Sequence, residues 1–254
     1  SSSIDASPDV FQVYGVDMTV DTLRAKGGVS VALQERTSIG LDLTIDALDL
    51  DAYIGTPTGT SATSSESKAA GSGGPSPVIK LKQQLAILDD FDANLELNVG
   101  QLLLQGTEVT NLRVDGGVYQ GEITLKELSV GDYLGAGGVL AGSMRELSRK
   151  PFADLRLDFD LRTPDALKNI VGNILPKTLG QLGAGKGNFS LKGDEGRVAV
   201  DLNAGFFGTE VSVKGAVVAP TSVPAVDLTL SVANNSTANL IKQFALPLDT
   251  PGAP

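Results

Sequence analysis

The chain has 254 residues, 30 of them glycine, and a net charge of −10, and it contains neither histidine nor cysteine. These absences exclude imidazole bases, thiol nucleophiles, disulfides, zinc–thiolate sites and iron–sulfur clusters. No segment is basic enough to suggest a nucleic acid partner, and no stretch reaches the ~18 apolar residues that a membrane-spanning helix needs.

The first clear pattern lies in residues 41–45, where Leu, Leu and Ile alternate with Asp and Thr. A period of two is typical of a strand with one apolar and one polar face. The same alternation returns in residues 155–161, 207–213 and 226–232. Glycine-containing segments at 26–28, 115–117 and 192–196 predict hairpin turns between antiparallel strands.

Residues 55–77 contain no large apolar residue and no periodicity, which predicts a flexible linker rich in Gly, Ser, Thr and Pro. The linker separates an N-terminal β segment, residues 1–54, from a main β domain, residues 78–254. We expect the N-terminal segment to join the same sheet. Capping and stripe patterns favour short helices at 163–175, 236–244 and 82–90.

The predicted fold is therefore mostly β. We expect an elongated, twisted antiparallel sheet or a partly closed half-barrel groove, with two or three short helices. Segments with a helical pattern are too few to reach the helix content of an average globular domain.

The candidates for chemistry are weak. Residues 180–187 look like a phosphate loop, but Gly187 follows Lys186 where Ser or Thr is required. Residues 90–96 resemble the start of a calcium loop, yet Leu95 stands at the glycine position and Gln101 at the final acidic position. No pair of carboxylates is singled out for acid–base work. We therefore expect no metal, no cofactor and no enzymatic activity.

The apolar strand faces leave two alternatives open. They either close on each other as a sandwich core or line an open trough, which a protein tolerates for a ligand or partner. If there is a groove, its floor is predicted to include Leu155, Leu157, Phe159, Leu161, Phe207, Val211, Val213, Leu228 and Leu230. The alternating residues that must then face water are Arg156, Asp158, Asp160, Ser212, Lys214, Asp227 and Thr229.

Several segments, taken in order, resemble the AsmA family of bacterial envelope proteins. Residues 48–54 and the linker after them resemble that family's strand end and variable insertion. The other matching segments are 91–99, 111–118, 137–143 and 179–215. Their order, with the linker in the right place, is the stronger part of the resemblance.

The resemblance implies a periplasmic β body, tethered to the inner membrane by an N-terminal anchor missing from this sequence. It also implies a role in envelope lipid homeostasis and outer-membrane assembly, with phospholipid acyl chains bound or conducted in an apolar β groove. The family offers no catalytic motif. The alternative is a non-enzymatic scaffold of the cell envelope with a closed β core, in contact with other envelope proteins.

Overall fold

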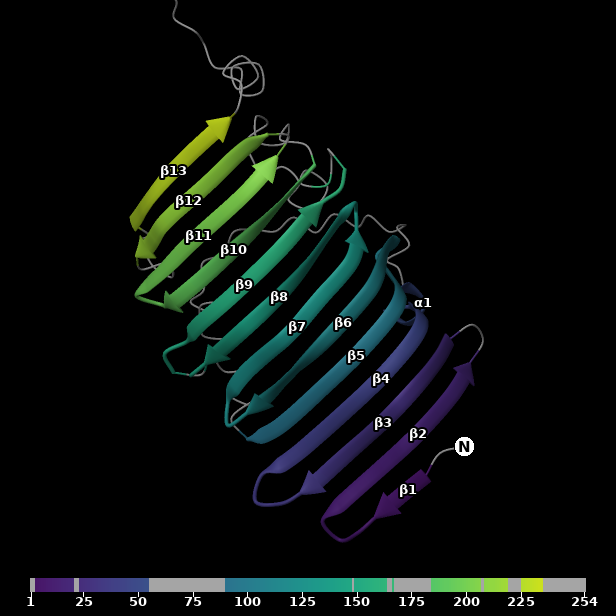
Figure 1. The fold of residues 1–254 in the computed structure, drawn as a ribbon. Coiled ribbons are helices and arrows are strands. Elements are labelled where there is room, and N and C mark those ends of the chain that lie inside the picture. Colours follow the sequence, from purple (N-terminus) through teal and green to yellow (C-terminus); the bar gives the residue numbers. More distant parts are fainter. Residues whose placement is uncertain are drawn as a thin grey trace, which may run out of the picture.

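The computed structural model describes residues 3–20, 23–54, 90–147, 149–163, 166, 184–206, 208–218 and 225–234. Thirteen strands form one sheet, and their order in the sheet follows their order in the sequence (Figure 1). The strands are β1 (Ser3–Ala6), β2 (Val10–Val20), β3 (Leu23–Leu33), β4 (Thr37–Asp49), β5 (Phe91–Leu104), β6 (Thr107–Tyr119), β7 (Glu122–Tyr133), β8 (Ala136–Arg145), β9 (Phe152–Leu161), β10 (Gly185–Asp194), β11 (Arg197–Phe206), β12 (Thr209–Val218) and β13 (Ala225–Asn234).

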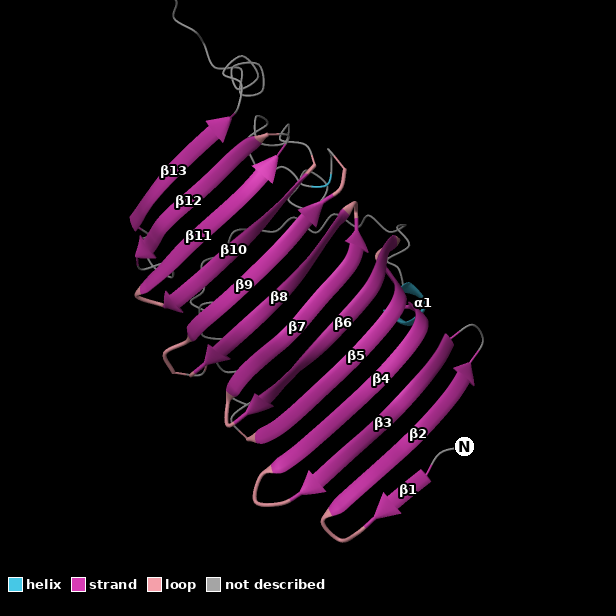
Figure 2. Ribbon diagram, viewed as in Figure 1, coloured by secondary structure: helices cyan, strands magenta, loops and turns pink. Residues whose placement is uncertain are grey.

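The sheet is long, twisted and open. β1 and β13 lie at opposite ends of it, so it does not close into a barrel (Figure 1). Figure 2 shows that nearly all of the described chain is strand. The mostly-β, elongated and twisted sheet predicted from the alternation is therefore confirmed.

The described part of the chain holds one short helix, and none of the predicted helices is tested there. The short helix α1 (Asp51–Ile54) follows β4, where the sequence suggested only a strand end. The three predicted helices, at 82–90, 163–175 and 236–244, lie almost wholly outside the described residues. The predicted linker at 55–77 lies outside them as well.

One strand pair departs from the predicted antiparallel pattern. β4 and β5 run parallel, with Leu41 opposite Leu95, whereas every other neighbouring pair is antiparallel. A parallel pair needs a connection of a dozen residues or more, and residues 50–90 supply that length. At the shared N-terminal end of the two strands, Arg36 donates from Nε and Nη2 to Asp92 Oδ1 at 3.2 and 3.0 Å. These hydrogen bonds from Arg36 are the main cause of a lowered pKa of Asp92, and a hydrogen bond from the Gln120 backbone N–H lowers it further.

Two of the three predicted turns are wrong. Residues 26–28 lie inside β3 and residues 115–117 inside β6, where a register shift falls between Asp115 and Gly116. Glycine inside a strand often marks a bend or a close backbone approach instead of a turn. The turn predicted at 192–196 is confirmed between β10 and β11.

Three of the other hairpins use a pattern that the sequence reasoning missed, and the third of them has Leu134 and Gly135 at positive φ. Gln105 and Gly106 have φ angles of +52° and +71°, and Gln120 and Gly121 have +51° and +76°. Two consecutive residues at positive φ are the mark of a type I′ turn, whose twist matches that of the strands. Asn or Asp usually precedes the glycine in such turns, so glutamine gave no clear signal.

Candidate functional site: the apolar face of the sheet

Side chains in neighbouring strands line up in rows across the sheet. The Leu155 row crosses all thirteen strands, because each member is paired with the next. Its members are Ile4, Val13, Val29, Leu41, Leu95, Gly116, Leu125, Gly142, Leu155, Leu191, Val200, Gly215 and Leu228. Every member is apolar or glycine.

A second row, the Leu157 row, runs beside the first on the same side of the sheet. It begins in β2 and ends in β13, and it contains Val16, Gly27, Leu43, Leu97, Val114, Leu128, Leu140, Leu157, Phe189, Leu202, Val213 and Leu230. We call the side of the sheet that carries these two rows the apolar face, and the other side the polar face.

The structure brings most of the predicted groove residues together on the apolar face. Leu155 and Leu228 belong to the Leu155 row, and Leu157, Val213 and Leu230 to the Leu157 row. Phe159, Val211 and Leu161 stand on the same face, because Phe159 and Val211 are linked through Gly187 and Ala204, and Leu161 lies two residues beyond Phe159. Phe207 lies outside the described residues. The sequence reasoning named none of the members in β2 to β8, although residues 41–45 carried the same alternation.

Exposure varies along the apolar face. Leu228 and Leu230 in β13 are 43% and 65% exposed, and Phe11 in β2 is 47% exposed, whereas Leu155 and Leu157 are half-buried. Large apolar side chains therefore remain open to solvent at both ends of the sheet. Contiguous exposed apolar surface of this kind is unusual on a monomeric soluble protein.

Two parts of the face are closed. Leu161 is 4% exposed and packs in a cluster with Ala136, Ala166, Ala204 and Phe206. Leu161 is thus a core residue, and it does not offer the open surface that the groove prediction assigned to it. A second cluster centres on Val99, Leu102 and Val109, over β4 to β7, and partly buried neighbours such as Ile45 and Leu48 pack against it.

Glycines set how closely the strands approach on this face. Gly142 in the Leu155 row has a φ of +143°, and a Cβ at this position would lie 2.1 Å from the carbonyl oxygen of Asp154. Gly215 in the same row has a φ of +153°, and its Cβ would lie 2.0 Å from the carbonyl oxygen of Asp227. Only glycine adopts this backbone region readily. The close approach of the neighbouring strand at these positions therefore depends on the absence of a side chain.

The polar face carries cross-strand ion pairs. Lys192 lies 2.5 Å from Asp154, and Lys214 lies 3.4 Å from Asp201, and each pair joins residues opposite each other in adjacent strands. Opposite charges at such positions favour one register over its neighbours. The groove prediction placed Arg156, Asp158, Asp160, Ser212, Lys214, Asp227 and Thr229 on the water-facing side, and all of them alternate with the apolar residues in this way.

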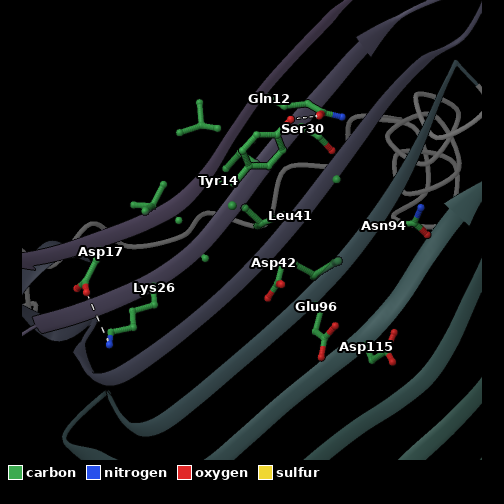
Figure 3. A pocket seen from close by; sticks show the side chains of 18 of the residues that line it. Gln12, Tyr14, Asp17, Lys26, Ser30, Leu41, Asp42, Asn94, Glu96 and Asp115 are labelled. Atoms are coloured by element: carbon green, nitrogen blue, oxygen red, sulfur yellow. Dashed lines mark hydrogen bonds and ion pairs between the residues drawn. The ribbon is translucent and has the colours of Figure 1, made fainter. Parts of the chain in front are cut away.

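An open hollow of about 780 Å³ lies over β2 to β7. Figure 3 shows the side chains around it, among them Asp42, Asn94 and Glu96. The Tyr14 hydroxyl donates to Gln12 Oε1 at 2.5 Å, and Lys26 pairs with Asp17 at 3.7 Å. The labelled polar side chains in this hollow belong to the polar face, and members of the Leu155 row such as Val13, Leu41 and Leu95 also line it. Sequence reasoning did not anticipate it.

Within the described ranges, no group of three or more acidic side chains is placed to hold a metal ion. None of the helices in the same ranges is long and apolar enough to cross a membrane. Comparisons with protein-family models, with curated proteins and with solved structures give no match for this chain.

Proposed function

We propose that the chain is a lipid-handling β module, and that acyl chains of phospholipid lie along its apolar face. The observation that carries the proposal is the continuity of that face. The Leu155 row passes through every strand without a charged or polar side chain, and the Leu157 row does so from β2 to β13. The resemblance to the AsmA family supports the same assignment.

The energetics favour a long, flexible apolar ligand. Burial of one methylene group of an acyl chain is worth ~0.8 kcal/mol, and a chain laid across several strands buries many of them. The Leu157 row offers Leu43, Leu97 and Leu157 as contacts, all only partly buried. A charge on this path would have to be desolvated under the ligand, which is costly. The absence of charges from both rows therefore suits an acyl chain.

The setting of the module is part of the proposal. On the AsmA-like assignment the β body lies in the periplasm, tethered to the inner membrane, and works in lipid homeostasis of the envelope. It needs no cofactor and performs no catalysis. The lipid is bound or passed along the sheet without a chemical change.

A structural scaffold of the envelope is the second candidate. The closed cluster around Leu161 favours it, because Ala166 has no exposed surface and packs directly against the apolar face there. If the same closure held along the whole sheet, the two rows would be ordinary core. The two candidates thus differ in whether the Leu155 and Leu157 rows accept a ligand.

A matched pair of variants in β4 separates the candidates. Leu43 is a half-buried member of the Leu157 row, and the next residue, Thr44, is exposed on the polar face opposite Lys26. Under the proposal, Leu43→Asp reduces the phospholipid that co-purifies with the protein at least several-fold, while Thr44→Asp leaves it unchanged. Native mass spectrometry and lipid extraction measure the bound lipid, and circular dichroism measures the fold.

A third variant keeps the test decisive if Leu43→Asp unfolds the chain. Leu230 belongs to the same row but is 65% exposed, so Leu230→Asp adds a charge without opening a core. Lipid loss in a folded Leu230→Asp protein supports the proposal. Equal lipid content in the wild type and both apolar-face variants, or no lipid in the wild type, favours the scaffold.

A further inference from the structure

The two edges of the sheet are unequal. β1 has four residues, whereas β13 has ten, and β13 pairs with β12 alone among the described strands. Nine of the ten β13 residues are exposed. The backbone N–H and C=O groups on the outer side of β13 therefore have no strand partner in the described part of the chain. Such an edge is a template for pairing with another strand.

β13 also lacks the features that usually protect an edge. It contains no Pro and no Lys, and Asp227 is its single charged residue. Its apolar side chains remain open: Val226, Leu228, Leu230 and Val232 are 63%, 43%, 65% and 37% exposed. A long, apolar edge without charges on the apolar face favours association.

We propose that β13 pairs antiparallel with β13 of a second copy of this chain, around a two-fold axis at Thr229. In this register Val226 lies opposite Val232 of the second copy, and Leu228 lies opposite Leu230. Each of the four large apolar residues then has an apolar neighbour on the same face. Asp227 faces Ser231, which separates the two Asp227 carboxylates.

Other registers of the same pair are poorer. A shift by one residue places the apolar side chains of one copy opposite the polar side chains of the other. A two-fold axis at Asp227 brings two carboxylates face to face, and like charges directly opposite are destabilising. An axis at Leu230 leaves Val226 opposite Asn234. The axis at Thr229 gives all four large apolar residues of β13 an apolar partner and separates the Asp227 carboxylates.

The dimer would extend the candidate lipid surface. A two-fold axis perpendicular to the sheet keeps both apolar faces on the same side, so the Leu155 row of one copy meets the Leu157 row of the other at Leu228 and Leu230. This pairing rests on the edge of β13 and does not require that the face binds lipid. Its failure and the failure of the proposed function are therefore measured separately.

Cysteine cross-linking tests the register directly, because the chain has no cysteine of its own. In the proposed dimer the two Thr229 residues face each other across the axis, within the Cα separation of ~4.4–6.8 Å that a disulfide needs. Thr229→Cys should therefore form a disulfide-linked dimer of twice 26.2 kDa under mild oxidation. Asp227→Cys alone should not, since its own counterpart lies four residues away along the strand, roughly 13 Å. A mixture of Asp227→Cys and Ser231→Cys chains should cross-link.

Sedimentation equilibrium of the unmodified chain tests the dimer itself. Thr229→Lys places two ammonium groups across the axis and should weaken dimerisation several-fold. The matched control is Thr124→Lys, at an exposed threonine on the polar face of β7, far from the edge; it should dimerise as the wild type does. A monomeric wild type at about 100 μM overturns the proposal. A disulfide between two Asp227→Cys chains would also overturn it. So would a Thr229→Cys chain that cross-links only to a Ser3→Cys chain, because that pair would join β13 to the β1 edge.

Discussion

Replacement of Gly142 by alanine should destabilise the sheet far more than an ordinary glycine substitution. Gly142 lies in β8, opposite Leu155 of β9, in the Leu155 row. A Cβ there would lie 2.1 Å from the Asp154 carbonyl oxygen and 2.9 Å from Leu155 Cα. Both contacts involve backbone atoms of β9, so no side-chain rotation can relieve them.

The magnitude follows from the two ways in which alanine can respond. Keeping the φ of +143° costs about 1–3 kcal/mol, because that region is almost exclusive to glycine. Moving β9 away instead weakens ladder hydrogen bonds worth roughly 1 kcal/mol each. The expected loss in the free energy of unfolding is therefore about 2–4 kcal/mol. In a chain of this size that loss lowers Tm by roughly 5–15 °C.

Gly205 provides the matched control. It lies in β11, and a Cβ there would meet no atom within 4 Å. Gly205→Ala should leave the free energy of unfolding within about 1 kcal/mol of the wild type, and the lower entropy of its unfolded chain even favours the folded state. Thermal and urea unfolding followed by circular dichroism measure both variants. Equal Tm values for the two would refute the close approach of β8 and β9 at Gly142.

Two further predictions concern half-buried carboxylates that hold turns. Asp51 accepts hydrogen bonds from the backbone N–H groups of Gln105 and Gly106 at 2.6 and 2.7 Å. Asp51→Ala should therefore lower the free energy of unfolding, measured with urea, by about 1–2 kcal/mol. Asp51→Asn keeps an acceptor oxygen and should lose less stability; an equal loss in the two variants would contradict the role of these bonds. The Lys150 side chain is the main cause, and backbone N–H groups the next, of a pKa of Asp194 lowered to about 2. The stability that the ionised Asp194 contributes is therefore present above about pH 4 and is lost as the pH falls towards 2. NMR titration should find that low midpoint and a higher one in Lys150→Met; an unchanged midpoint would remove Lys150 as the main cause.

The sequence alone determined the class of fold and the two-faced character of its strands. In residues 41–45 and 155–161, apolar residues alternate with Asp, Arg and Thr. This alternation indicates a strand with one apolar and one polar face, because successive side chains of a strand point to opposite faces. The absence of histidine and cysteine removed whole classes of chemistry without any structure. These inferences needed only neighbours in the chain.

The glycine segments could not be assigned to turns or strands from the local sequence alone. Residues 26–28 and 115–117 looked like turns, yet they lie within β3 and β6. A glycine that makes a turn and one that admits a close neighbouring backbone have the same local sequence. The difference lies in what stands opposite: for Gly142 it is the Asp154 carbonyl, twelve residues away along the chain.

Only the tertiary structure decided how the strands combine into one surface. The parallel pairing of β4 with β5 depends on where the chain returns after residue 50, which alternation does not encode. The phase of the alternation also changes within β5, because Val99 and Leu102, three residues apart, pack in the same cluster. Register between strands is set by turns, bulges and cross-strand contacts along the whole sheet. The thirteen-strand Leu155 row is a sum of such registers, and for that reason no single segment of the sequence could predict it.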